Sequence, residues 1–150
     1  MFSGEPPAAD TWYETVVGPD DPRVDTPVTL RIRQQPEGLC YEASEDAEGL
    51  IRSLIGLDDP LEQIYEAMPS HPLITTAIDR YPGLRIVADP PVPCLLSFIC
   101  SAQMRVARTY QLQLQIAETF GRYWGWDGER LPGFPTAERL ARVSEAELRE

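Results

Sequence analysis

The sequence predicts an α+β protein in which a small antiparallel sheet is followed by a mainly α-helical part. Before residue 44, apolar Val28, Leu30 and Ile32 alternate with polar residues, which is the pattern of a strand with one buried face. From residue 44 onward, apolar residues recur every three or four positions, as in amphipathic helices. With 150 residues, the chain fits one domain of ordinary size or a piece of a larger protein.

Three strands are expected in residues 11–43. The strand-like segments read TWYETVV, TPVTLRIRQ and GLCYEA, and the breaks between them, GPDDP and QPEG, are typical of turns. Residues 1–10, MFSGEPPAAD, are small, acidic and rich in proline, so they predict an irregular lead. The first third of the chain therefore predicts three antiparallel strands joined by short turns.

The rest of the chain is expected to form several short helices, because helix-start signals recur along it. Ser44 precedes AEGLIRSLIGL as a cap, an aspartate precedes Pro60, and Ser70 with Pro72 opens the next segment. The lone histidine, His71, has no partner at metal-ligand spacing and is expected to occupy that helix start. Further starts are expected at about Val92, at Thr136 and at Ser144.

The charge of the chain limits its chemistry. The formal net charge is −11, but residues 1–100 hold 17 acids and 6 arginines, whereas residues 101–150 hold 7 of each. Every basic residue is an arginine, so no lysine can act as a nucleophile or form a Schiff base. An acidic, lysine-free surface is typical of a halophile, because screening in a cytoplasm of very high salt limits self-repulsion.

Metal and cofactor chemistry is not expected. Asp58 with Asp59, and Asp20 with Asp21, could suggest a metal or acid–base site, but beside prolines such pairs usually serve as caps and turns. No HExxH, P-loop or GxSxG motif occurs. The sequence therefore predicts no metal site and no cofactor.

The cysteines and the apolar runs bear on the cellular location. Cys40, Cys94 and Cys100 are an odd number without CxxC spacing, and no signal-type segment opens the chain. The longest apolar run, residues 94–100, is far shorter than the roughly 20 residues that cross a bilayer. Reduced thiols, a cytoplasmic location and no membrane partner are expected.

The stretch CLLSFICSAQMRVART, residues 94–109, changes character at its middle. Its first half is apolar on all sides, which predicts a helix in the centre of a multi-helix core. Polar residues then interrupt it, and a second helix begins with Arg105 and Arg108 three positions apart on one face. Helix N-termini and arginines attract phosphate, and a glutamine at a protruding tip can bond a base edge. A plain solvated turn is the alternative.

The longer stretch DPPVPCLLSFICSAQMRVAR resembles the helix-turn-helix signature of 8-oxoguanine DNA glycosylase / AP lyases of the helix-hairpin-helix superfamily. The resemblance continues in LDDPLEQIYEAM, YPGLRIVADPP and GFPTAERLARVSEAELRE, and it covers roughly residues 40–150. It implies DNA base-excision repair, with removal of an oxidised purine. The expected partner is double-stranded DNA with a damaged purine opposite cytosine.

The resemblance also implies a DNA-binding site at the turn. In the family, this turn enters the duplex where the damaged base has been flipped out, and the arginine that closes the motif contacts the orphaned cytosine. Carried over, Gln103 fills the gap together with Met104, and Arg108 contacts the cytosine. Arg105 completes the expected DNA-binding set, although a run of asparagines stands in the family where this chain has Gln103, Met104 and Arg105.

The catalytic groups of the family are not found in this sequence. The family's helix-hairpin-helix, lysine nucleophile and aspartate follow the matched region, and this chain has no lysine. The resemblance therefore implies an incomplete glycosylase, inactive alone, with no catalytic residue here. In that interpretation residues 11–43 are a partial N-terminal domain, and residues 44–150 are the first part of the glycosylase domain, truncated before the helix-hairpin-helix.

Two questions stay open at this stage. The chain could instead be a non-catalytic protein-binding or DNA-binding subunit that docks a separate catalytic half, so a separate C-terminal half is a second expected partner. The aromatic cluster YWGWDG, residues 123–128, could form a stacking surface for bases or could pack in the core beside a turn.

Overall fold

The computed structural model describes residues 11–149, so the irregular lead predicted for residues 1–10 lies outside the described residues. The described chain contains helices and two small antiparallel sheets, which confirms the predicted α+β class. Contacts divide it into two compact units. One unit is Glu48–Asp89, and the other combines the segments before and after it.

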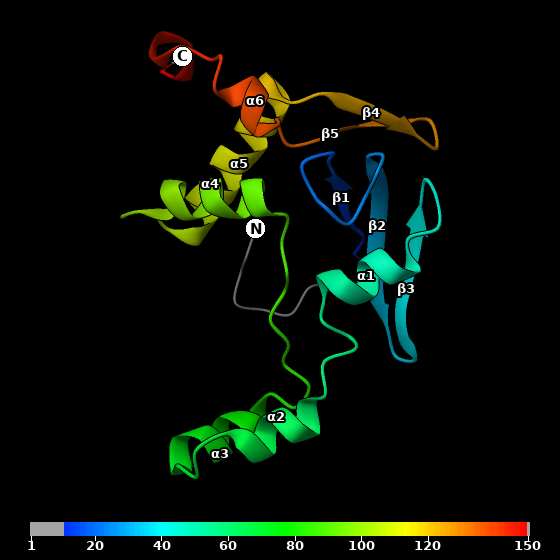
Figure 1. Ribbon diagram of the computed structural model, residues 1–150, viewed down its shortest axis with the longest axis vertical. Coiled ribbons are helices and arrows are strands. Elements are labelled where there is room, and N and C mark those ends of the chain that lie inside the picture. Colours follow the sequence, from blue (N-terminus) through cyan, green and yellow to red (C-terminus); the bar gives the residue numbers. More distant parts are fainter. Residues whose placement is uncertain (1–10, 150) are drawn as a thin grey trace. The chain divides into compact units, whose positions relative to one another are not determined.

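The first sheet has the predicted strands in the order β1-β2-β3 (Figure 1). Both neighbouring pairs are antiparallel, so β2 is the central strand. Its side chain Leu30 is fully buried, and Val17 and Val28 are almost as inaccessible. Val28 and Leu30 of the predicted alternation are therefore in the core, whereas Ile32 is only half-buried and the polar Thr29 is buried beside them. The strands are β1 (Tyr13–Val17), β2 (Val28–Gln35) and β3 (Gly38–Ala43).

The second sheet is a hairpin that the sequence analysis did not predict. Strands β4 (Tyr123–Trp126) and β5 (Glu129–Pro132) pair in an antiparallel register. Asp127 and Gly128 make the turn between them, with φ values of 51° and 78°. Positive φ at both central residues is what a type I′ hairpin turn requires, and an Asp-Gly pair favours it. The aromatic residues of the cluster therefore lie on β4, directly before this turn.

Close backbone approach fixes the base of this hairpin. Gly133 N donates a hydrogen bond to Arg122 O at 2.9 Å. A Cβ on Gly121 would lie 2.0 Å from the carbonyl oxygen of Gly133 and 2.3 Å from that of Ala117. Any larger residue at position 121 would push the hairpin away from the end of the preceding helix.

The unit outside Glu48–Asp89 also contains, among its described residues, the four helices α4 (Pro91–Ser101), α5 (Val106–Phe120), α6 (Ala137–Leu140) and α7 (Glu145–Leu148). The two predicted late helix starts are confirmed. Thr136 Oγ1 accepts a hydrogen bond from Arg139 N at 3.2 Å. Ser144 and Glu147 form a reciprocal capping box at α7, with Ser144 N donating to Glu147 Oε2 at 2.8 Å.

The unit Glu48–Asp89 holds α1 (Glu48–Leu54), α2 (Leu61–Ala67) and α3 (Pro72–Arg80). His71 is the residue before α3, and its Nδ1 accepts a hydrogen bond from Leu73 N at 3.2 Å. The prediction that this histidine occupies a helix start is confirmed. The expected cap from Ser70 is wrong, because the histidine takes that role.

Two other predicted caps are also wrong. Ser44 Oγ accepts a hydrogen bond from Thr29 N at 3.1 Å, and Ser44 N donates to Thr29 O at 2.9 Å. Since α1 begins four positions later, Ser44 instead extends the bonding of the sheet. At α2 the N-cap is Pro60, which makes no side-chain cap.

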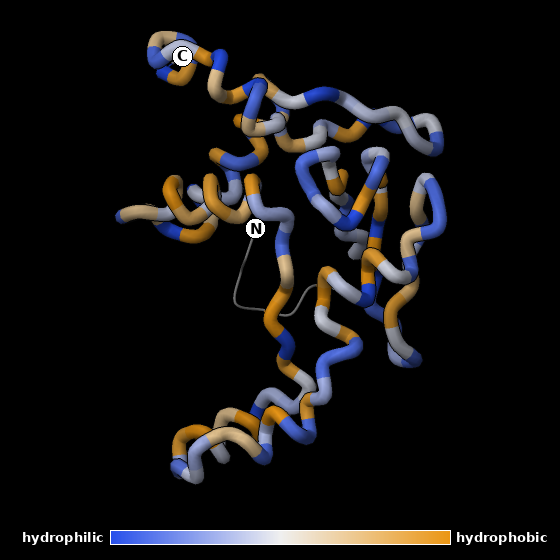
Figure 2. Tube along the Cα trace, viewed as in Figure 1, coloured by the Kyte–Doolittle hydropathy of each residue, from blue (hydrophilic) through white to orange (hydrophobic). Residues whose placement is uncertain are grey.

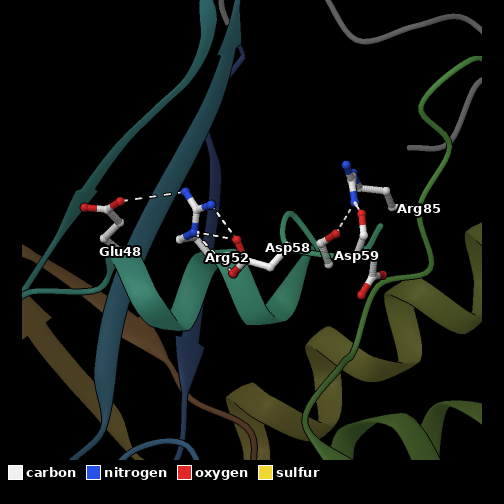
Figure 3. Close-up of polar contacts among 6 residues, drawn as sticks. Glu48, Arg52, Asp58, Asp59 and Arg85 are labelled. Atoms are coloured by element: carbon white, nitrogen blue, oxygen red, sulfur yellow. Dashed lines mark hydrogen bonds and ion pairs between the residues drawn. The ribbon is translucent and has the colours of Figure 1, made fainter. Parts of the chain in front are cut away.

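Two arginines form hydrogen bonds to the loop that follows α1 (Figure 3). Arg52 Nε donates to Asp58 Oδ1 at 3.0 Å, and this hydrogen bond holds the pKa of Asp58 below its ordinary value. Arg85 Nη1 donates to the carbonyl oxygens of Gly56 and Asp59, the latter at 3.3 Å. The carboxylate of Asp58 therefore pairs with Arg52, whereas Asp59 contributes its carbonyl oxygen to the contact with Arg85.

Helix α4 departs from the prediction of a buried core helix. It contacts α5, but Leu95, Phe98 and Ile99 are 60%, 77% and 58% exposed. Figure 2 shows orange, apolar colour along much of this helix. An apolar helix becomes buried only where other apolar elements surround it, and residues 11–149 do not surround α4. Across the same residues, no helix has both the length and the apolar character needed to span a membrane.

Candidate nucleic-acid interface

A tight turn joins α4 to α5 and carries the residues that the sequence singled out. Residues 102–105 connect the two helices, as predicted. Met104 N donates to Ser101 O at 3.0 Å, and Ser101 Oγ donates to Phe98 O at 2.8 Å. These local bonds close the turn and satisfy carbonyl oxygens at the end of α4.

Gln103 stands at the tip of the turn in a left-handed backbone conformation, with φ at 60°. Few residues other than glycine adopt this region, and the strain costs on the order of 1 kcal/mol. Such strained positions often belong to functional sites. The side chain of Gln103 is exposed, and Met104 beside it is 46% exposed. The two side chains at the tip are therefore accessible to a large partner.

The two arginines lie at the start of α5. Arg105 is the residue before the helix and Arg108 is in its first turn, and both are exposed. The carbonyl oxygen of Arg105 accepts from Arg108 N at 2.9 Å, from Thr109 N at 3.0 Å and from Thr109 Oγ1 at 3.4 Å. Thr109 is buried, and sequence reasoning missed it because a threonine in a first turn carries no distinct signal. The structure thus brings Gln103, Met104, Arg105 and Arg108 together around one turn.

The electrostatic setting of this turn differs from that of the whole chain. Residues 90–117 contain no aspartate or glutamate, although the net charge of the protein is −11. The N-terminus of α5 adds a partial positive charge and backbone N–H groups to the two guanidinium groups. The turn can therefore attract phosphate and, through planar donors, hydrogen-bond the edge of a base.

Two aromatic residues of β4 have arginine neighbours. Arg122 lies 4.6 Å above the ring of Trp124, and Arg130 lies 5.2 Å from the ring of Tyr123. Tyr123 is exposed and Trp124 is half-buried, so the cluster is not a packed core. One arginine guanidinium thus lies within cation–π distance of each of these two rings.

The remaining candidates are structural. Asp20 Oδ2 accepts from Ala137 N at 2.8 Å and so caps α6, while Asp21 binds Arg23 through three hydrogen bonds. In the described part of the chain, no cluster of three or more histidine, cysteine, aspartate or glutamate residues could hold a metal ion.

Sequence comparison places the chain near known DNA-repair enzymes. It is 30% identical over 108 residues to a DNA-3-methyladenine glycosylase of Bacillus subtilis, a match that covers 69% of this chain and 35% of that protein. It is also 35% identical over 69 residues to the N-glycosylase/DNA lyase OGG1 of Arabidopsis thaliana, covering 45% of this chain and 19% of the relative. A similar enzyme of Saccharomyces cerevisiae is 39% identical over 70 residues. No family model matches the chain.

Solved structures show the same fold. The 8-oxoguanine glycosylase/lyase of Clostridium acetobutylicum, bound to double-stranded DNA with cytosine opposite 8-oxoguanine, superimposes with a TM-score of 0.69 at 23% identity. That match covers 81% of this chain and 42% of the other. A 3-methyladenine DNA glycosylase of Archaeoglobus fulgidus gives a TM-score of 0.71 at 20% identity, covering 93% of this chain and 50% of the other. At these identities the likeness establishes the fold.

The chain has the fold of solved DNA glycosylases. Its homologues and structural neighbours are 8-oxoguanine glycosylases and related 3-methyladenine glycosylases of the helix-hairpin-helix superfamily, so the resemblance found in the signature is confirmed. The chain spans about a third of the length of its Bacillus relative and half or less of the structural neighbours.

Proposed function

We propose that this chain is the lesion-recognition part of a DNA base-excision glycosylase of the 8-oxoguanine type. The observation that carries the proposal is the exposed turn between α4 and α5. It presents Gln103 in a strained conformation beside Arg105 and Arg108, in a stretch without acidic residues. Its partner is double-stranded DNA with a damaged purine opposite cytosine, by analogy with the DNA held by a structural neighbour.

In the proposed complex, each residue of the turn has a separate task. Extruding a damaged base leaves a gap whose unstacking costs a few kcal/mol, and Gln103 with Met104 fills it. Arg108 donates hydrogen bonds to the orphaned cytosine, and Arg105 contacts the phosphate backbone. A positive helix N-terminus and two arginines are suited to these contacts.

The reaction proposed for the whole protein is removal of the oxidised purine followed by cleavage at the abasic site. This chain has no lysine to form the Schiff base of that second step. We therefore propose that the nucleophile and its supporting aspartate are supplied from outside residues 1–150. In this scheme residues 11–43 belong to the N-terminal domain and residues 44–150 to the first part of the glycosylase domain, and the protein acts in the cytoplasm of a halophile.

The test is DNA binding by the chain and by Arg108→Ala at one fixed salt concentration. Duplexes carry an abasic-site analogue opposite cytosine, the same analogue opposite adenine, or no damage. Arg108→Ala should weaken binding to the first duplex by about 1 to 3 kcal/mol and relax its preference for cytosine. Arg142→Ala is the control, because it makes the same change of net charge just after α6, where Arg142 pairs with Glu138. This variant should not alter the preference for cytosine.

An equal loss of affinity for damaged and intact duplexes would show that Arg108 contacts only the phosphate backbone. The proposed contact between Arg108 and cytosine would then have to be abandoned. The absence of any preference of the unaltered chain for damaged DNA would contradict the proposed function itself.

A second candidate function is a non-catalytic subunit that docks a separate C-terminal half. The exposed apolar side chains Leu95, Phe98 and Ile99 of α4 favour it, since apolar patches of this kind mark protein interfaces. A stable complex between this chain and a separately produced C-terminal half would support this candidate. Substituting Phe98 by serine should then weaken the complex while leaving the arginine-bearing turn intact.

A further inference from the structure

Helices α4 and α5 are joined by a polar contact outside the turn itself. Gln113 Nε2 donates a hydrogen bond to Ser97 Oγ, and both residues are half-buried. Among the described residues, this is the one side-chain hydrogen bond between the two helices. It lies about one helical turn before the end of α4 and two turns into α5.

The apolar packing between these helices is incomplete. A groove of about 410 Å³ runs along them, and Ser97 and Gln113 are part of its wall. Its other lining residues are Cys94, Phe98, Ser101, Met104, Val106, Thr109 and Tyr110. Where side chains interdigitate fully, ridges and grooves fix the angle between two helices. Here that constraint is weak, so a directional hydrogen bond contributes more to the angle.

The turn itself does not fix this angle. Its closing bonds are local, from Met104 N to Ser101 O and within the first turn of α5. Gln103 lies in the turn, whereas Arg108 lies in α5. The distance between their side chains therefore depends on the direction of α5 relative to the turn. A side chain that recognises one base beside a gap-filling residue has to be held within about half an ångström of its working position.

We propose that Ser97 and Gln113 are positioning residues that set the angle between α4 and α5 and thereby place Arg108 relative to Gln103. The inference rests on the proposed DNA-binding role of the turn. It assigns a function to a polar pair inside an otherwise apolar contact, and neither residue touches the DNA. The pair affects the reading of the opposite base and leaves the contacts to phosphate largely unchanged.

The test uses Gln113→Leu, with Gln115→Leu as the matched control, because Gln115 is an exposed glutamine on the same helix. Loss of one hydrogen bond should reduce the preference for cytosine opposite an abasic-site analogue by about three- to tenfold. Binding to undamaged duplex should stay within about twofold of the unaltered chain. Ser97→Ala should reproduce the loss, and Ser97→Thr, which keeps the hydroxyl, should restore the preference. The double variant should be no worse than either single variant.

A measurement without DNA separates this inference from the proposed function. Backbone amide resonances of residues 103–108 should shift in Gln113→Leu and in Ser97→Ala, but not in Gln115→Leu. Unchanged amide resonances in the first two variants would overturn the positioning role, whatever the DNA results. Shifted resonances in a chain that shows no preference for damaged DNA would support the positioning role and contradict the proposed function instead.

Discussion

The guanidinium of Arg31 lies 5.0 Å from the ring centroid of Trp126, so strand β2 is joined to a hairpin that begins more than ninety residues later in the chain. Trp12 lies on the same guanidinium at 5.2 Å. Arg31 Nε also donates to Glu42 Oε2 at 2.8 Å, and Arg31 Nη2 pairs with Asp127 Oδ2 at 3.2 Å. One planar cation thus connects the two sheets of this unit through stacking and ion pairing.

Substituting Arg31 by lysine should lower the melting temperature, by roughly 2 to 4 °C. The charge is kept, but an ammonium cannot stack between two indoles while donating to a carboxylate. Arg130→Lys is the matched control, because Arg130 stacks on Tyr123 within one hairpin. Thermal circular dichroism gives the melting temperatures. Equal shifts in the two variants would show that Arg31 does not join the sheets.

Asp21 should make the free energy of unfolding fall at acidic pH. Its side chain is buried, and hydrogen bonds from Arg23 hold its pKa below the ordinary value of about 3.9. Because the folded carboxylate binds its proton less tightly than the unfolded one, the stabilisation is complete above about pH 4 and is lost as the pH falls through the folded pKa. Asp21→Asn should therefore lower the melting temperature at pH 7 and flatten its decline below pH 4. Asp25→Asn, at an exposed position, should preserve both features.

Replacing Gln103 by glycine should move stability and function in opposite directions. Glycine adopts the φ of 60° without strain, so the variant should gain up to about 1 kcal/mol in the free energy of unfolding. The side chain proposed to fill the gap is lost, so extrusion of the damaged base should slow. The fluorescence of 2-aminopurine beside the lesion measures this rate. Ala102→Gly is the control, because Ala102 has a φ of −56° and should only lose stability. A loss of stability in Gln103→Gly would show that its conformation is not strained.

Borohydride should trap no covalent complex between this chain and DNA that contains an abasic site. The trapped species needs an amine nucleophile, and the sequence supplies no lysine. A lysine-containing glycosylase/lyase serves as the positive control in the same gel assay. Acetylating the α-amino group removes the last amine, so trapping that survives acetylation would contradict the proposal that the nucleophile lies outside this chain.

The exposed face of α4 should bind a hydrophobic dye and promote self-association, most strongly at low salt. Phe98→Ser should reduce the dye fluorescence with little effect on stability, since Phe98 is 77% exposed. Leu96→Ser should instead lower stability, because Leu96 is half-buried in the same helix. Dye titration measures the exposed apolar surface, and light scattering measures self-association. A compact monomer that binds no dye would argue against an interface on this face.

The features that the sequence predicted correctly depend on interactions between residues close together in the chain. The alternation of Val28, Leu30 and Ile32 predicted a strand with a buried face, and the starts at Thr136 and Ser144 were correct because a cap acts within one helical turn. The signature around residues 94–108 likewise predicted a helix, a turn and a second helix. The hairpin of β4 and β5 was missed although its Asp-Gly turn was visible, because the aromatic residues before it fit a packed core equally well.

The tertiary structure decided which partners those residues have. Ser44 bonds to Thr29 of a neighbouring strand instead of capping a helix, and Arg31 stacks on an indole far along the chain. Helix α4 is apolar enough for a core, yet burial depends on what surrounds a helix and not on its own composition. The sequence therefore determined most elements and the residues of the turn, but not the β4–β5 hairpin. Only the structure shows Gln103 in the left-handed region and Arg108 exposed in the first turn of α5, because such geometry leaves no periodic signal in the sequence.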